Sequence, residues 1–343
     1  MQTNLRLAVA GILLAGLPLA YSDILWANAT TPPTPTLKLT AAEEAYQKGE
    51  QHMEKGETEK ALQHLQEAVR LQPDNHVFLE SLGIAYMTNN EPLKALEVFE
   101  KALKLKPEAA SYHDSRGLAL LQLGRMEDAA GAFGKAIELE PAVGDYHNSL
   151  GHALLALGKA AEAVSSFQRA VVLVPEEPDF HESLALGYLT HGMYELSVKS
   201  AREAIKLNNK VAGYHDTLAL GLLGSGEVLQ AEEAARQAVG LDGKSVDFRS
   251  TLGIVLLNQD KYEAAEKVFR DALKIEPENA DLFDSLSIAL MGQDRLDEAE
   301  EASRKAVRLK PDNSLYLENL ANILRLQGKD AEADRLLLPA IRT

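Results

Sequence analysis

The chain of 343 residues contains no cysteine. This absence excludes a disulfide framework, a thiolate metal site, a thiol nucleophile and a lipid attached through a cysteine. Aromatic residues make up only 6% of the sequence, and basic residues are outnumbered, 35 lysines and arginines against 51 aspartates and glutamates. Such an acidic chain repels phosphate backbones and anionic membrane surfaces, so nucleic acid is not expected as a partner.

The sequence also lacks the motifs of enzyme active sites. Its best candidate nucleophiles are serines that recur at a constant interval (Ser115, Ser149 and Ser183). Each has a histidine two positions earlier, a spacing that directs the two side chains to different sides of a helix. A catalytic site needs unlike residues in unlike roles, and none is present. The chain is therefore predicted not to be an enzyme and to use no cofactor, with an enzymatic or metal-binding role as the minor alternative.

The only long apolar run lies in residues 1–29. A short, weakly positive start precedes an apolar run over residues 7–21, and Ala27-Asn28-Ala29 supplies small residues for a peptidase. This is the pattern of a secretory signal peptide. We expect cleavage after Ala29 and a periplasmic or secreted mature chain. The alternative is an uncleaved membrane anchor over residues 8–27, although Asp23 lies within it. Residues 30–41 are rich in proline and threonine and are predicted to form an extended linker.

From residue 42 to its end, the chain repeats with a period of 34 residues, nine times. The period predicts helix–turn–helix units, starting near residues 42, 76, 110, 144, 178, 212, 246, 280 and 314. One column contains only residue types that tolerate a left-handed backbone, which is needed just past a helix end. These residues are Gly56, Asn90, Gly124, Gly158, Gly192, Gly226, Asp260, Asp294 and Gly328.

The repeat resembles a known family in its sequence signature. Leu82-Gly83, Tyr86, Ala95, Phe99, Ala102 and Pro107 are similar to the consensus of the tetratricopeptide repeat. The resemblance extends over about 300 residues. It implies an all-α fold, a right-handed α-solenoid of stacked antiparallel helix pairs. Glycines on the first helices and alanines on the second, such as Gly117 and Ala129, are predicted to let the two helices approach closely.

The resemblance implies that the first helix of each unit lines a concave, partner-binding surface. One column on these helices is expected to form an exposed acidic rail, and the column four residues later to form an apolar floor. Together they favour a protein or peptide with apolar and basic residues. The alternative is that the acids are merely solvated and the aliphatics are core between repeats. The candidate residues are Glu80, Ile84, Asp114, Leu118, Asn148, His152, Glu182, Leu186, Asp216, Leu220, Ile254, Asp284, Ile288 and Glu318.

Two other roles make different demands on the sequence. Tetratricopeptide domains that hold chaperone C-termini grip the terminal carboxylate with lysine and asparagine on these helices. Acids such as Asp114 would repel that carboxylate, so this clamp is not expected. Self-assembly through the C-terminal end is the competing structural role, because the last unit contains the apolar run Leu336-Leu337-Leu338-Pro339 near the end of the chain and no extra capping helix is expected.

Four histidines, His113, His147, His181 and His215, recur at the period. Neighbouring repeats stack about 10 Å apart, whereas zinc ligands lie about 2.0–2.1 Å from the metal. The imidazoles are therefore expected to be bonded locally, with no metal bound. A pH-dependent role in packing is the alternative.

The repeats near residues 195–245 lose the aromatic of the second helix, which is replaced by Ala201 and Ala235. We expect looser packing there and a hinge, with ordinary drift in a repeat array as the alternative. Amide hydrogen exchange that is uniform along the chain would exclude the hinge.

Overall fold

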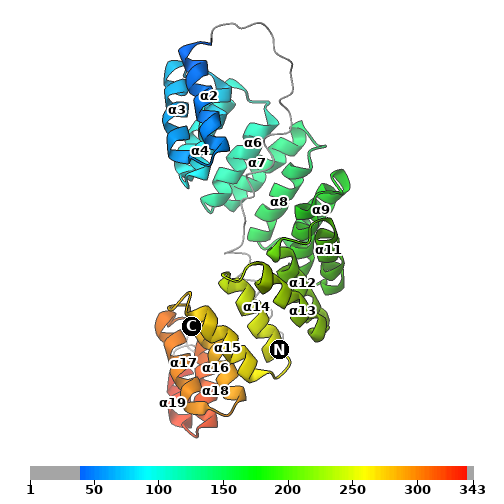
Figure 1. Ribbon diagram of the computed structural model, residues 1–343, viewed down its shortest axis with the longest axis vertical. Coiled ribbons are helices and arrows are strands. Elements are labelled where there is room, and N and C mark those ends of the chain that lie inside the picture. The colour runs from blue at the N-terminus through cyan, green and yellow to red at the C-terminus, as the bar shows by residue number, and fades with distance from the viewer. Residues whose placement is uncertain (1–38, 338–343) are drawn as a thin grey trace. The chain divides into compact units, whose positions relative to one another are not determined.

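The computed structural model describes residues 39–337. These residues form the helices α2 to α19, and no strand occurs among them (Figure 1). The predicted all-α solenoid of stacked helix pairs is confirmed. The predicted signal peptide, most of the linker and residues 338–343 lie outside the described part. Within that part, no helix has both the length and the apolar character to cross a bilayer.

The described residues divide into two compact units, 39–187 and 188–337, here called the N-terminal and C-terminal units. The helices of the first are α2 (Ala41–Glu54), α3 (Thr58–Leu71), α4 (His76–Thr88), α5 (Pro92–Leu105), α6 (Ala110–Gln122), α7 (Met126–Leu139), α8 (Gly144–Ala156), α9 (Ala160–Leu173) and most of α10 (Pro178–Thr190). Those of the second are α11 (Tyr194–Leu207), α12 (Ala212–Ser225), α13 (Val228–Leu241), α14 (Val246–Leu257), α15 (Tyr262–Leu273), α16 (Ala280–Gly292), α17 (Leu296–Leu309), α18 (Ser314–Leu326) and α19 (Asp330–Leu337). Even-numbered helices are the first of each repeat and odd-numbered helices the second.

The turn inside each repeat has the backbone conformation that the sequence predicts. All nine residues of the predicted turn column have a positive φ, from 54° at Asp260 to 85° at Gly226. They are also the only residues of the described part with this conformation. Three of them are asparagine or aspartate, residue types that adopt the left-handed region at small energetic cost.

Four of the helix pairs are held together by a phenylalanine on the second helix that packs against a glycine on the first. Phe99, Phe133, Phe167 and Phe269 are completely buried. A Cβ atom added to Gly117 would lie 2.5 Å from Cε1 of the Phe133 ring, so only glycine leaves room for this ring. The atoms nearest to this position all belong to the Phe133 ring, so Gly117 makes room for an aromatic ring, and the close approach of the two helices stays a prediction.

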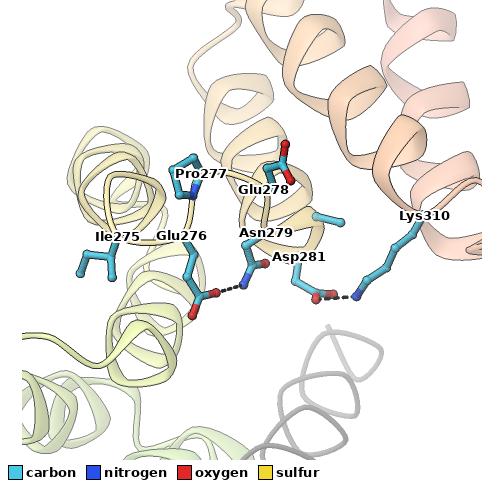
Figure 2. Close-up of a pocket in the computed structure, with 8 residues that line it drawn as sticks. Ile275, Glu276, Pro277, Glu278, Asn279, Asp281 and Lys310 are labelled. Carbon is cyan, nitrogen blue, oxygen red and sulfur yellow. Dashed lines mark hydrogen bonds and ion pairs between the residues drawn. The ribbon is translucent and has the colours of Figure 1, made fainter.

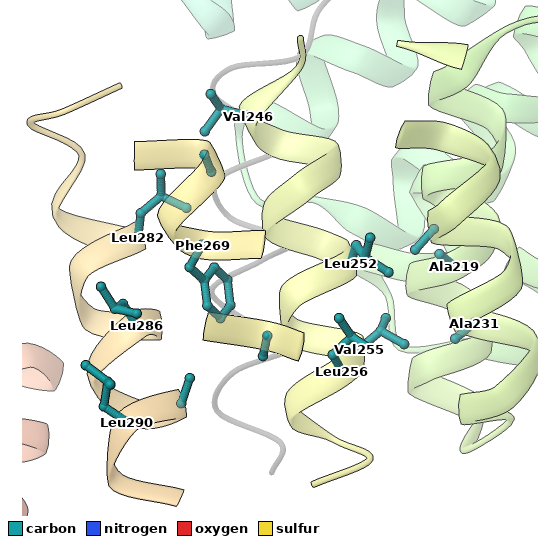
Figure 3. Packing of buried hydrophobic residues seen from close by; sticks show 14 of the residues in the cluster. Ala219, Ala231, Val246, Leu252, Val255, Leu256, Phe269, Leu282, Leu286 and Leu290 are labelled. Atoms are coloured by element: carbon teal, nitrogen blue, oxygen red, sulfur yellow. The ribbon is translucent and has the colours of Figure 1, made fainter. Parts of the chain in front are cut away.

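The C-terminal unit shows what happens where the phenylalanine is missing. Ala235 takes its place on α13, and the residue across from it in the repeat pattern is Ala219 rather than glycine; both are fully buried in the main cluster of this unit. Figure 3 shows the cluster around Phe269, Leu282 and Leu286. Buried alanines keep this region packed, and the hinge at residues 195–245 stays a prediction.

Candidate functional site

The first helices of neighbouring repeats contact one another directly within each unit. Helix α4 contacts α2 and α6, and α6 contacts α8; in the C-terminal unit, α14 contacts α12 and α16, and α16 contacts α18. We call the surface that they form in each unit the first-helix face. Most of the sequence-predicted site residues lie on these helices, in two separate sets; Glu182 and Leu186 lie on α10.

The expected exposure of the acidic column is wrong for several of its members. Asp216 and Asp284 are only 4% and 5% exposed, and the Oδ1 atom of Asp114 is buried. Glu80, Asn148 and Glu182 are half-buried, and only Glu318 is exposed. This column is therefore largely a seam between helices. The acids one turn earlier are more accessible, since Asp179, Asp247 and Asp281 are exposed.

Two of the buried acids are hydrogen-bonded to the following repeat, which compensates in part for the loss of water. Asn319 Nδ2 donates to both carboxylate oxygens of Asp284, at 3.0 and 2.9 Å. Asp114 is hydrogen-bonded to Ser149, the residue that corresponds to Asn319 in its own repeat. In both cases the partner is 35 residues further along the chain. One position after the acids, the repeats carry a column of serine, threonine and asparagine that includes Ser149 and Asn319. This column is the feature of the sequence that could have revealed these bonds.

Burial of the carboxyl groups raises their pKa values into the neutral range. Desolvation raises the pKa of Asp114 to about 7, against the opposing hydrogen bond from Ser149 and with a further increase from Asp145. The pKa values of Glu80 and Asp284 rise to about 6 for the same primary reason. A carboxyl that is partly protonated at neutral pH attracts a cation less strongly than the fully ionised carboxylates expected for the acidic rail.

His152 is the one polar residue in the predicted apolar column. Its Nε2 atom lies 3.1 Å from Ser183 Oγ on α10, and its ring packs edge-on against Phe167, with ring centroids 5.0 Å apart. Desolvation lowers the pKa of His152 to about 4, so the imidazole is neutral at physiological pH. It contributes a hydrogen bond between repeats and no charge.

The aliphatic members of that column are divided between the surface and the core. Leu220 is completely buried, whereas Ile84, Leu118, Leu186, Ile254 and Ile288 are half-buried. Ile84 and Leu118 pack at the edge of one core cluster and Ile254 at the edge of another. Each therefore belongs partly to the core and partly to the first-helix face.

The four periodic histidines are bonded locally, as expected. In each case Nε2 donates to a backbone carbonyl six residues earlier, just past the end of the preceding helix. These carbonyls belong to Pro107, Pro141, Pro175 and Asn209, at 2.8, 3.0, 2.8 and 3.1 Å. The described residues hold no group of three or more side chains arranged to ligate a metal ion.

A shallow depression of about 800 Å³ lies at the start of α16 (Figure 2). Four of its polar side chains are already paired: Asn279 donates to Glu276 at 2.7 Å, and Lys310 forms an ion pair with Asp281 at 2.9 Å. Tyr316 donates a further hydrogen bond to Asp281. These paired groups stabilise the start of the helix.

The model of the tetratricopeptide repeat matches this chain over residues 46–110, 80–144, 115–178, 148–212 and 285–337, and a second model of the same repeat matches residues 222–288. The chain belongs to the tetratricopeptide repeat family. Proteins built from this repeat are typically non-catalytic scaffolds for protein interactions. No curated protein matches the chain.

Solved structures share its fold at low sequence identity. A chain of the APC/C hetero-tetramer Cut9–Hcn1 is 15% identical, with a TM-score of 0.63 over 78% of this chain and 52% of that one. This tetratricopeptide repeat chain thus spans about half of that relative's length. A tetratricopeptide repeat protein from Parabacteroides merdae is 17% identical, with a TM-score of 0.59 over 73% and 99%. PilF of Pseudomonas aeruginosa is 21% identical, with a TM-score of 0.53 over 61% and 95%.

Proposed function

We propose that the chain is a non-catalytic scaffold that binds a protein or peptide on its first-helix face. One observation carries the proposal: half-buried aliphatic side chains lie one helical turn after polar or acidic residues on successive first helices. Leu118 follows Asp114 on α6 in this way, and Ile84 follows Glu80 on α4. Apolar patches with a polar surround are the usual composition of a protein interface.

The chemistry of the face favours a partner with apolar anchors and basic residues. The half-buried aliphatics offer apolar contact, while the exposed acids Asp179 and Asp247 and a net charge of −16 attract cations. Of the candidate residues, Asp216, Leu220 and Asp284 are too buried to touch a partner and would support the face from beneath. A chaperone tail with a free carboxylate does not fit this charge.

The first test is a change of Leu118 to serine. Selection of a random peptide library on the full chain should enrich peptides that combine apolar residues with lysine or arginine. The L118S variant should bind the selected peptides about 10- to 100-fold more weakly, because one leucine contact is removed. Affinities measured by fluorescence anisotropy check this, with circular dichroism to verify folding.

Val172 on the second helix α9 provides the matched control. It is 69% exposed, so V172S removes an aliphatic side chain of similar size away from the first-helix face. Unchanged affinity in V172S is expected. Equal affinity in L118S, or enrichment of acidic peptides, would contradict the proposed binding face.

We further propose that the chain is exported, on the basis of the three-part pattern in residues 1–29. If a signal peptidase cleaves after Ala29, the mature protein recovered from the periplasm or medium should begin at Thr30. Intact-mass measurement of the protein expressed in a bacterial host tests this. A full-length chain retained in the membrane fraction would instead support the anchor.

A further inference from the structure

In the C-terminal unit, three glutamates on second helices occupy the same repeat position, and each joins its repeat to the next. Glu232, Glu266 and Glu300 lie on α13, α15 and α17, and their side chains are 14%, 14% and 15% exposed. We call them, with their cationic partners, the glutamate ladder.

The contacts of the three glutamates are nearly identical. One oxygen of each accepts from an arginine four residues later on the same helix, at 2.7–2.9 Å. The other accepts from a lysine or arginine at the start of the next repeat's second helix, at 2.6–2.7 Å. The arginines are Arg236, Arg270 and Arg304, and the cations of the next repeat are Lys261, Arg295 and Lys329.

A glutamine of the next repeat completes the ladder. Gln259 donates to Glu232 at 2.9 Å, and Gln293 donates to Glu266 at 2.8 Å. The other charged groups that contact ladder members are also carboxylates. Glu298 pairs with Arg295 and Arg270, and Glu332 pairs with Arg304. Each half-buried glutamate thus has two cations of its own.

The N-terminal unit has apolar residues at the same repeat position. They are Leu62, Leu96, Ala130 and Val164; the leucines and the valine are 7–8% exposed and belong to the core, and Ala130 packs at its edge. Val198 on α11 is also apolar at this position, so the ion pairs begin at α13, where they add to the apolar core of the C-terminal unit. Apolar burial responds little to salt and pH, whereas an ion-pair network between half-exposed cations and a carboxylate responds to both.

We propose that the glutamate ladder is a conformational switch confined to the C-terminal unit. At high ionic strength or in acid its ion pairs weaken, and the repeats of this unit loosen from one another while the N-terminal unit keeps its packing. Because each repeat contacts only its neighbours, loss of these contacts uncouples the repeats of one unit without unfolding the other.

The direction of the pH effect follows from the carboxyl groups. Hydrogen bonds from Lys261, Arg236 and Gln259 lower the pKa of Glu232 from 4.5 to about 2. Burial would raise the pKa of Glu266, but hydrogen bonds from Gln293, Arg270 and Arg295 outweigh it and lower the value; Glu300 behaves in the same way. The stabilisation is therefore complete above about pH 4.5 and is lost as the pH falls through the lowered pKa values.

Amide hydrogen exchange of the full chain, followed by mass spectrometry, tests the switch. When NaCl is raised from about 0.01 M to about 1 M, the Debye length falls from about 30 Å to about 3 Å. Protection of α13, α15 and α17 should then fall about tenfold more than protection of α5, α7 and α9. An equal response in both units would overturn the proposal.

Two substitutions at one position separate the ladder from general packing. E266Q should lower the protection of α15 and α17 at low salt, because it removes the charge and keeps the shape. E266L installs the residue type of Leu96 and should lose the salt response while keeping protection. E263Q, at an exposed position on the same helix, is the control and should behave as the parent chain. Full salt sensitivity of α15 and α17 in E266L would also overturn the proposal.

Discussion

Replacing Phe133 by alanine is expected to destabilise the N-terminal unit by about 3–5 kcal/mol. The ring is completely buried between α6 and α7, and it fills the space above Gly117. Alanine would leave a cavity that the two helices cannot close without disturbing the neighbouring repeats. Urea unfolding of the full chain, with hydrogen exchange to assign the loss to α6 and α7, measures the effect.

A second substitution tests whether the glycine and the ring depend on each other. G117A should destabilise the parent chain by about 1–3 kcal/mol, since its Cβ would overpack against Phe133. In the F133A background the ring is gone, and the same change should stabilise the chain by up to about 1 kcal/mol through better helix propensity. The sign of the effect should therefore reverse.

Gly131 on α7 provides the control for helix propensity. A Cβ added there meets no atom within 4 Å, so G131A should be mildly stabilising in both backgrounds. If G117A had the same effect with and without the Phe133 ring, the proposed pairing of glycine and phenylalanine would be wrong.

The features that could be predicted from the sequence are those set within one repeat. The turn column required a left-handed backbone at each of nine positions, and residues such as Gly124 and Asn90 adopt it. That requirement is local, because only the chain just before the turn decides whether a side chain is tolerated. The helix pairs follow from the same local patterns, and the family resemblance supplied their stacking.

The candidate site depends on contacts between repeats, and its burial could not be predicted in the same way. A period of 34 places Asp284 on a first helix, but does not say whether it points outward or toward α18. Its bond to Asn319 requires the rotation of one helix relative to the next. The glutamate ladder was missed for the same reason, since residues 29 apart, such as Glu266 and Arg295, meet only once the repeats are stacked.

The burial of Asp114 leads to an expected gain of stability when it is changed to asparagine. Its pKa is raised from 3.8 to about 7, so the folded chain holds this proton more tightly than the unfolded chain does. Well below pH 3.8 both states are protonated and the carboxyl has no net effect on stability. As the pH rises to about 7, the unfolded chain loses its proton first and the folded state is penalised, by an upper limit of roughly 4 kcal/mol.

D114N removes this penalty because an amide does not ionise. The same position one repeat later is Asn148, which shows that the site accepts an amide. The stability difference between D114N and the parent chain should be small near pH 4 and reach on the order of 2–4 kcal/mol in favour of the variant by about pH 7. Urea denaturation at a series of pH values gives this difference directly.

The reverse substitution at the neighbouring position provides the matched comparison. Asn148 Oδ1 is buried without a hydrogen-bond partner among the described residues, so N148D should create a second buried carboxyl and a stability loss that grows from pH 4 to pH 7. E97Q, at an exposed position on α5, should change little at any pH. A D114N gain that was the same at pH 4 and pH 7 would show that ionisation of Asp114 does not limit the stability of this seam.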